Sequence, residues 1–284
     1  MIDEKIFNDL INYKKPVIFI GDSAQLPPVS NSKNRFDIFK NTIHQLTEIH
    51  RQVKDSPIIK LSMMIRNGDE IKKEFFDNNP IVQFKDYLSL PDYIDIYNPS
   101  NDDIFLCGMN NTRVNMNKRI RSALGYRRSE PTVGETIINL RNNHHLGVMN
   151  GQTGILKYVR KLENFCYEAD VDFSEDYMTT HCVYKQGFNK VTQNDYWDLL
   201  RDYKIRYQVK AHGFDKLDLF DFGYCLSVHK SQGDQWNNVY LISEKNNYQS
   251  YEEFAKWFYT AVTRTVNKLT IFDKCGFWNN VILK

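Results

Sequence analysis

The chain has 284 residues, of which 42% are hydrophobic and 25% charged, and its formal net charge is only +2. This composition excludes an intrinsically disordered protein, and no run approaches the ~20 consecutive apolar residues of a membrane-spanning helix, so we expect no membrane partner. The acidic opening Met1–Lys5 is not typical of a secretory signal peptide. Five widely spaced cysteines without a C-x-x-C pair argue against a disulfide framework or a zinc site and favour a reducing cytoplasm.

Helix and strand signals alternate along the chain, which predicts an α/β fold with a parallel sheet. Amphipathic spacing over residues 2–12 predicts a helix that Pro16 ends, and the continuous apolar run 17–20 predicts a strand buried on both faces. An S-x-x-E capping box at Ser250 and Glu253 predicts where the last helix begins. The same signals predict further helices at 56–67, 111–124 and 251–263, and further strands at 104–107, 239–242 and 269–272.

The middle of the chain, residues 131–222, has a different pattern and predicts a small β-rich insertion in the α/β fold. Strands are expected over 134–138 and 154–159, and Asn150-Gly151 between them has the composition of a hairpin turn. Residues 160–215 are polar and aromatic with weak periodicity, so the sequence assigns no structure to them.

The first chemical motif follows the expected strand at 17–20 and runs from Gly21-Asp22 through Gln25 to Pro27-Pro28. It places a carboxylate and a carboxamide at the carboxyl end of a strand, where ligands gather in open α/β sheets. A carboxamide there can hydrogen-bond a phosphate oxygen or an attacking water. A solvent-exposed turn explains the same residues equally well, because Gly-Asp and Pro-Pro both favour turns.

Three further motifs carry groups that suit phosphate and nucleic-acid contacts. The segment L-T-E-I-H-R-Q at 46–52 contains Arg51, whose planar guanidinium can bind phosphate. The segment S-V-H-K-S-Q-G at 227–233 gathers hydroxyl, imidazole, ammonium and amide groups before a glycine. The segment Y-T-A-V-T-R at 259–264 carries Arg264 to a helix end, where it can reach a nucleotide across a cleft. Taken singly, Arg51 is also explained as a solvated surface residue. Arg264 is also explained as a residue that caps the C-terminal end of a helix.

The order of the four motifs is more specific than any one of them. G-D-x-x-Q-L-P-P, L-T-E-x-x-R-Q, S-x-H-K-S-Q-G and Y-T-A-V-T-R follow one another over residues 21–264. In this order they resemble motifs three, four, five and six of the superfamily 1 DNA helicases of the RecD/Dda type. Asn110-Asn111-Thr112-Arg113 is similar to a strand-end segment of that family's second motor domain, and Asn150-Gly151 resembles the start of its inserted barrel.

The resemblance implies an α/β protein built from RecA-like parallel-sheet motor domains, which bind ATP between them and lie across single-stranded DNA. It implies a remnant of the first motor domain at 1–45 and a second motor domain at 46–130 and 223–284. Between the two parts of that second domain it implies a β-barrel insertion at 131–222. Enzymes of this family move 5′ to 3′, so the resemblance implies the same polarity.

The resemblance also implies roles for single residues. Gln25, Arg51 and Arg264 would be catalytic, the first sensing the γ-phosphate and the two arginines reaching it from the second domain. The residues expected near the nucleotide are Gly21, Asp22, Gln25, Gly233 and Gln235, the last of which replaces a glutamate common in the family. The residues expected on the DNA strand are Pro27, Pro28, Asn110, Ser227, His229 and Lys230.

Two parts of a complete ATP site have no counterpart in these 284 residues. The chain contains no G-x-x-x-x-G-K-[ST] phosphate loop, and Asp3-Glu4 lacks the buried strand that precedes a magnesium-binding carboxylate. Met1–Phe7 is instead similar to the helix that follows the family's D-E-x-S-M segment. We therefore expect ATP and Mg²⁺ to bind only with a separately encoded N-terminal motor half, and we expect the chain alone not to hydrolyse ATP.

Two other functions stay open at the level of sequence. The chain could be a non-enzymatic single-stranded nucleic-acid-binding or regulatory module derived from a helicase, in which aromatic residues, 14% of the total, supply stacking platforms. It could also be a non-functional remnant. A G-K-[ST] loop encoded upstream of Met1 would favour the split helicase, DNA binding without such a half would favour the module, and failure to fold or bind DNA would favour the remnant.

Overall fold

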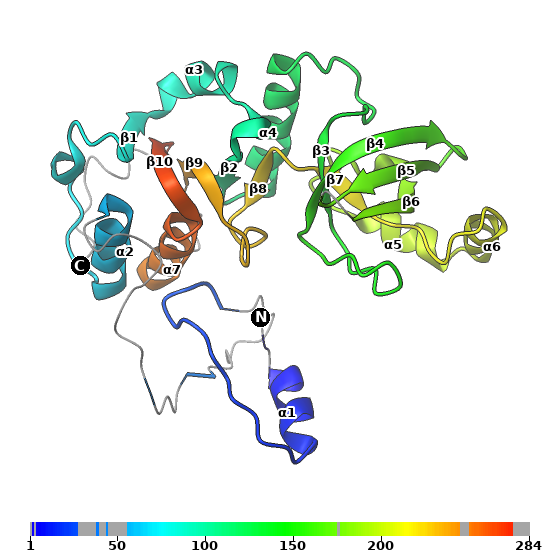
Figure 1. The fold of residues 1–284 in the computed structure, drawn as a ribbon, viewed down its shortest axis with the longest axis horizontal. Helices are drawn as coiled ribbons and strands as arrows, with labels where there is room; N and C mark the ends of the chain where they lie inside the picture. The colour runs from blue at the N-terminus through cyan, green and yellow to red at the C-terminus, as the bar shows by residue number, and fades with distance from the viewer. Residues whose placement is uncertain are drawn as a thin grey trace.

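Among the described residues, a five-stranded parallel sheet forms the centre of the protein (Figure 1). Its strands lie in the order β1-β10-β9-β2-β8, and each neighbouring pair is parallel. The computed structural model describes residues 2, 4–27, 38–39, 44, 56–174, 177–244 and 250–274. The strands are β1 Val82–Asp86, β2 Asp103–Cys107, β8 Cys225–Ser227, β9 Trp236–Ser243 and β10 Thr265–Asp273.

Helices cover both faces of this sheet (Figure 1). They are α2 Pro57–Asn67, α3 Leu90–Asp95, α4 Asn110–Ala123 and α7 Tyr251–Val262. Ile104 and Leu106 of β2 belong to the apolar core under α2 and α7. The alternate residues Phe105 and Cys107 belong to a second core under α3 and α4. Because successive strand residues point to opposite faces, this single apolar strand contributes to both cores, as expected for a buried parallel strand.

Helix α7 begins at the predicted capping box. The Glu253 backbone N–H donates to Ser250 Oγ at 3.2 Å, and the Ser250 backbone N–H donates to the Glu253 carboxylate at 3.2 Å. These bonds satisfy two helix N–H groups that have no partner within the helix. Phe254, Trp257 and Phe258 then bury one face of α7 against the sheet. Local capping and apolar spacing therefore fix the helix that carries the fourth motif.

A second, antiparallel sheet lies between α4 and β8 in the chain, with strand order β6-β5-β4-β3-β7. The edge strand β6 also bonds to a residue just before the other edge strand, since Tyr184 N donates to Asp218 O at 2.9 Å and Asp218 N donates to Cys182 O at 2.7 Å. Two helices, α5 Asn194–Arg201 and α6 Tyr203–Ala211, lie between β6 and β7. The strands are β3 Thr136–Asn139, β4 Thr153–Lys161, β5 Cys166–Asp172, β6 Met178–Tyr184 and β7 Phe220–Phe222.

The predictions for the α/β part are confirmed at α1 Glu4–Asn12 and at α2, β2, α4, β9, α7 and β10. The two strands predicted at the start of the insertion are confirmed as β3 and β4. The predictions omitted β1, whose residues are mostly half-buried at the sheet edge, and β8, which has three residues. Short 3₁₀ helices occur at Lys73–Phe76, Tyr87–Ser89, Pro99–Asn101 and Lys185–Gly187.

The strand predicted at 17–20 is wrong. This segment has no regular secondary structure and pairs with none of the described strands, and the side chains of Ile18 and Ile20 are 86% and 89% exposed. A strand of a parallel sheet needs a neighbour for its backbone hydrogen bonds, and apolar composition alone cannot supply one. Phe19 instead packs on Phe7 of α1, with ring centroids 5.1 Å apart.

The Asn150-Gly151 prediction needs a correction too. These residues do form a turn, in which Gln152 N donates to Met149 O at 3.2 Å and Gly151 has φ +99°. They do not join β3 directly to β4, however, because the connection spans residues 140–152 and contains its own bridge, Asn143 with Val148. The dipeptide therefore marks a turn within a longer loop.

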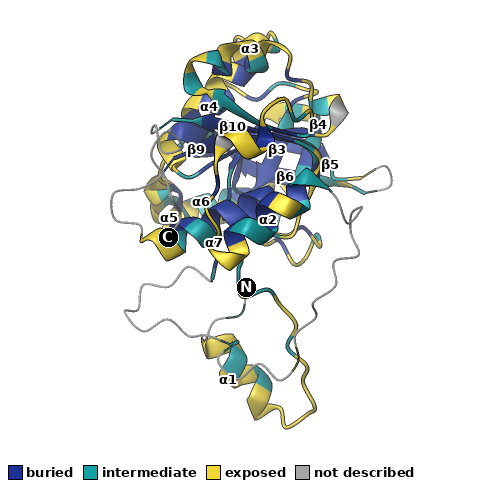
Figure 2. Ribbon diagram, turned by 90° about the vertical axis from the view of Figure 1, so that its left-hand side faces the viewer, coloured by how far each residue is buried: buried dark blue, intermediate teal, exposed yellow. Residues whose placement is uncertain are grey.

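None of the described residues before residue 21 is buried. Helix α1 has no buried residue and stands apart from the main body in two views at right angles (Figures 1 and 2). Leu26 is buried in the core that α2 and α7 share. No helix in the described ranges has the length and apolarity needed to cross a membrane.

Candidate functional site

Asp22 ties the first motif to two helices of the α/β body. Its carboxylate accepts a 2.8 Å hydrogen bond from the Tyr259 hydroxyl of α7 and lies 3.4 Å from Arg66 Nη1 of α2. It also accepts from the backbone N–H of Ala24 at 3.1 Å. Burial and the bond to Asp22 raise the pKa of Tyr259 to about 12, so the phenol stays a donor at neutral pH. The carboxylate is therefore occupied by protein groups.

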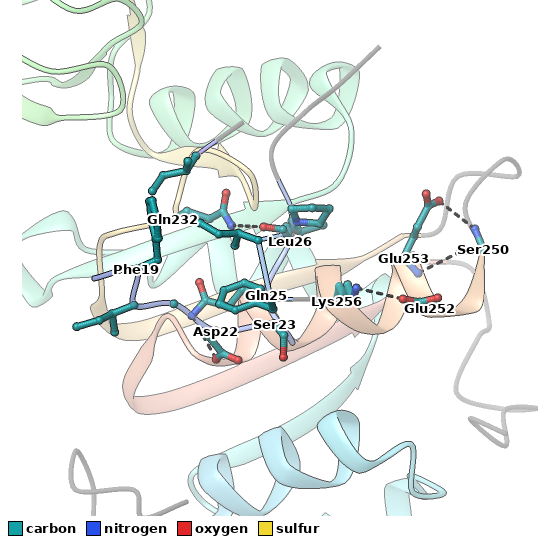
Figure 3. Close-up of a pocket in the computed structure, with 16 residues that line it drawn as sticks. Phe19, Asp22, Ser23, Gln25, Leu26, Gln232, Ser250, Glu252, Glu253 and Lys256 are labelled. Atoms are coloured by element: carbon teal, nitrogen blue, oxygen red, sulfur yellow. Dashed lines mark hydrogen bonds and ion pairs between the residues drawn. The ribbon is translucent and has the colours of Figure 1, made fainter. Parts of the chain in front are cut away.

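Leu26 makes a second attachment, through its backbone. Its N–H donates to Thr260 Oγ1 of α7 at 2.9 Å. Its carbonyl accepts from Gln232 Nε2 at 3.0 Å (Figure 3). The Thr260 hydroxyl is itself held by donating to Lys256 O at 2.7 Å. Gln25 lies between the two attachments, with Nε2 3.5 Å from an Asp22 oxygen. Residues about 230 positions apart in the sequence are thus joined at one place.

A cavity of about 570 Å³ lies beside this junction (Figure 3). The first motif from Gly21 to Pro27 lines one side, and Gln232 and the first turns of α7 line another. Among the described residues, the charged side chains that line it are Asp22, Glu252, Glu253 and Lys256. Because these give three carboxylates against one ammonium, and Lys256 is paired with Glu252 at 3.1 Å, the described lining does not fit a triphosphate on its own.

Arg264 lies just after α7 and is buried. Its Nε donates to Thr260 O at 3.1 Å, Nη1 to Asp234 O at 3.1 Å and Nη2 to Thr263 Oγ1 at 3.2 Å. This is the helix-end position that the sequence favours for the fourth motif. Since Thr260 also binds Leu26, the structure brings the first and fourth motifs to the same turn of α7.

The third motif meets the fourth at the same helix end. Gly233 is exposed in a turn with φ +105°, where a side chain would be strained. Gln235 is exposed and its Nε2 lies 3.5 Å from Thr263 O. Asp234, between these two residues, accepts from Arg264 Nη1 through its carbonyl, so this turn lies beside the end of α7. Arg51 and Pro28 lie outside the described residues.

A second cluster of predicted residues lies where α4 begins and β8 ends. Ser227 ends β8, and its carbonyl accepts from Lys230 N at 2.8 Å. The Lys230 ammonium donates to Asn150 Oδ1 at 2.8 Å, which links the body to the 140–152 loop of the insertion. Asn110, the first residue of α4, is exposed, and its Oδ1 lies 3.5 Å from Arg113 Nε. His229 is half-buried next to these groups in sequence.

Burial sets the charge of this cluster. Desolvation, assisted by the Arg113 cation, lowers the pKa of Lys230 to about 8, so the ammonium persists at neutral pH and is lost above it. Burial also lowers the pKa of His229, which makes its imidazole neutral at pH 7. Arg113 is held by the buried Asp221 carboxylate and by Lys190 O at 2.8 Å. The cluster therefore offers one titratable cation among neutral hydrogen-bonding groups.

Three contributors were not predicted from the sequence. Tyr259 and Thr260 stand in the fourth motif, yet their contacts with the first motif needed the fold to be seen. Asn150 was predicted as a turn residue and also binds Lys230. Among the described residues, no group of three or more His, Cys, Asp or Glu side chains forms a candidate metal site.

Two family models match parts of the chain. Residues 222–272 match the UvrD-like helicase C-terminal domain, and residues 1–86 match an AAA domain. Among curated proteins, the RecBCD enzyme subunit RecD of Buchnera aphidicola subsp. Schizaphis graminum is 26% identical over 152 residues. That match covers 54% of this chain and 19% of the RecD subunit, about a fifth of its length.

Solved structures of similar fold are Pif1 helicases. The crystal structure of Pif1 helicase from Bacteroides in complex with ADP-AlF3 and ssDNA gives a TM-score of 0.52 at 16% identity, over 88% of this chain and 60% of that one. The crystal structure of Bacteroides Pif1 bound to ssDNA gives a TM-score of 0.51 at 16% identity, over 89% of this chain and 61% of that one. At such identities the likeness shows the fold alone, which is RecA-like and confirms the predicted fold class. The barrel form of the insertion stays a prediction.

Removing the Asp22 carboxylate should release the first motif. In Asp22→Ala we expect the backbone N–H groups of 24–26 to exchange with solvent about tenfold faster, because losing these hydrogen bonds costs about 1.4 kcal/mol of local opening free energy. Hydrogen exchange with mass spectrometry measures this. Asp9→Ala on the exposed α1 is the matched control and should change nothing there. Unchanged exchange at 24–26 in Asp22→Ala would contradict the anchoring role.

Proposed function

From its similarity to the C-terminal portion of superfamily 1 helicases of the RecD and Pif1 type, we propose that this chain is the single-stranded-DNA-binding and nucleotide-sensing part of an ATP-dependent DNA helicase. One observation carries the proposal. The first motif, from a segment that precedes the parallel-sheet body, is hydrogen-bonded to α7 and to the turn after β8, which carry the fourth and third motifs. Motifs far apart in sequence therefore form one junction, as a nucleotide site shared by two motor domains requires.

The nucleotide side of the proposal uses the junction around α7. Gln25 would sense the γ-phosphate, and Arg264, with Arg51, would respond to it. Gly21, Asp22, Gly233 and Gln235 would lie close to the bound nucleotide. In the described structure Asp22 and Arg264 are both hydrogen-bonded to protein groups, which would hold the parts of the proposed site together.

The charge of the cavity supports the proposal that two polypeptides each supply part of the nucleotide site. In the described part of the cavity lining, carboxylates outnumber the ammonium group, so this part would repel a triphosphate unless a phosphate loop and a bound Mg²⁺ were added. We propose that a separately encoded N-terminal motor half supplies both. The chain then comprises a first-domain remnant at 1–45, a second motor domain at 46–130 and 223–284, and a barrel-like insertion at 131–222.

The DNA side of the proposal uses the cluster at the start of α4 and the end of β8. Lys230 would attract phosphate, and Asn110, Ser227 and His229 would donate or accept hydrogen bonds along the strand. Pro27 and Pro28 would contact the same strand from the first motif. Two Pif1 structures of similar fold contain single-stranded DNA, which is consistent with this ligand. Translocation from 5′ to 3′ is part of the same proposal.

A non-enzymatic DNA-binding module is the second candidate. The observation that favours it is the same cavity, because its described lining is acidic and does not suit a triphosphate, whereas the cluster proposed to bind DNA offers the Lys230 cation. The two candidates share the DNA surface and differ in whether ATP is ever bound. A G-K-[ST] loop and a D-E strand encoded upstream of Met1 would favour the helicase.

The DNA proposal predicts that Lys230 contributes one phosphate contact. For a labelled oligothymidylate, Lys230→Gln should reduce the slope of log affinity against log salt by about 0.7 at pH 7. The wild-type slope should fall toward that of Lys230→Gln between pH 7 and pH 9, because the ammonium with a pKa of about 8 is lost in this interval. Lys230→Arg should keep its slope throughout, because its cation does not titrate there.

Fluorescence anisotropy at several salt concentrations measures these slopes. Lys60→Gln, which removes an exposed cation from α2, is the control for a general change in charge. A Lys230→Gln protein with the wild-type slope at pH 7 would remove Lys230 from the DNA surface.

The nucleotide proposal predicts that the chain alone neither binds ATP at micromolar concentration nor hydrolyses it. The physical reasons are the surplus of carboxylates in the described lining of the cavity and the lack of a phosphate loop in the sequence. Isothermal titration with ATP and Mg²⁺, together with a phosphate-release assay with oligothymidylate present, checks both parts. Micromolar binding would mean that this chain holds a complete nucleotide site. It would overturn the proposal that a separate N-terminal half supplies part of that site.

A further inference from the structure

Helix α6 of the insertion has an outer face with an unusual composition. Ile205 and Val209 point inward, onto the apolar cluster shared with β5, β6 and α5. The opposite side of the helix carries Tyr203, Arg206, Tyr207 and Lys210, which we call the α6 outer face. All these side chains are exposed, and those of the two tyrosines are 68% and 74% exposed.

The spacing on this face alternates aromatic and basic groups. Tyr203 and Tyr207 are four residues apart, as are Arg206 and Lys210, so each pair lies one helical turn apart on adjoining rows. With Lys204, α6 has three basic residues and no acidic one. The nearest carboxylate in sequence, Asp202, caps the helix by accepting from Lys204 N at 2.8 Å. The face is therefore positive as well as aromatic.

A loop connects this region to the cluster at β8. Asn150, near one end of the 140–152 loop, accepts from Lys230 at 2.8 Å. Arg141, near the other end, stacks its guanidinium 4.3 Å from the ring centroid of Trp197 on α5. Helix α5 packs against α6. The 140–152 loop and helix α5 therefore connect Lys230 to α6 through a series of polar and aromatic contacts.

We propose that the α6 outer face is a second contact for single-stranded nucleic acid, used by a strand too long to be held by the α4–β8 cluster alone. Bases stack on tyrosine rings whatever their sequence, and the neighbouring Arg206 and Lys210 attract the phosphates. The alternation of aromatic and basic residues therefore suits both the bases and the phosphates of a single strand. A protein partner is the competing occupant, and it does not by itself account for the excess of positive charge. This proposal goes beyond the proposed motor function. It rests on that function only for the expectation that the single strand is DNA.

The experiment compares labelled oligothymidylates of about 8 and about 24 nucleotides on the full chain by anisotropy. In the double variant Tyr203→Ala, Tyr207→Ala we expect at least tenfold weaker binding of the long strand and unchanged binding of the short one. Tyr203→Phe with Tyr207→Phe should bind as wild type, because the rings remain. Arg206→Gln with Lys210→Gln should lower the salt slope for the long strand only.

Tyr13→Ala and Tyr158→Ala remove exposed tyrosines elsewhere and should bind both strands as wild type does. Unchanged affinity of the tyrosine double variant for the long strand would overturn the proposal and leave the face to a protein partner. Equal losses for both strands would overturn it too, since the face would then not be a separate contact. If Lys230→Gln leaves short-strand binding intact while the tyrosine variant weakens long-strand binding, the second contact stands and the proposed motor surface fails.

Discussion

The backbone of Leu26 is the attachment on which the arrangement of the site depends. Its N–H and carbonyl are both taken up by side chains of the α/β body, Thr260 at 2.9 Å and Gln232 at 3.0 Å. Asp22 adds a third attachment through Tyr259. Since residues 4–20 contribute no buried side chain, these contacts give the first motif its position. Without them Gln25 would have no fixed relation to α7.

Charge separates the two proposed surfaces. The described lining of the cavity at the junction has more carboxylates than cations, whereas the α4–β8 cluster presents Lys230 and the α6 outer face is basic. Single-stranded DNA would therefore bind this chain directly, while ATP would need phosphate-binding groups from elsewhere. The same separation explains how a chain with a net charge of only +2 can carry a nucleic-acid surface.

The sequence predicted best where the signal is local. The α7 capping box and the apolar strands β2 and β9 follow from neighbouring residues, and all are confirmed. The error at 17–20 arose because burial depends on a pairing partner that apolar composition does not report. Site contacts such as Asp22 with Tyr259 join residues 237 positions apart, beyond any local pattern. Asn117 of α4 is fully buried and donates to the Phe222 and Cys225 carbonyls, a contact that only the fold shows.

The central claim is that the start of α4 and the turn after β8 form one surface for single-stranded DNA. Hydrogen exchange of the wild-type chain with and without a short oligothymidylate tests it most directly. We predict slower exchange at 108–113 and at 227–233 when the oligonucleotide is added, with no change in α1. Slower exchange confined to α1 or to the β1 edge of the sheet, with both of these segments unaffected, would contradict the claim.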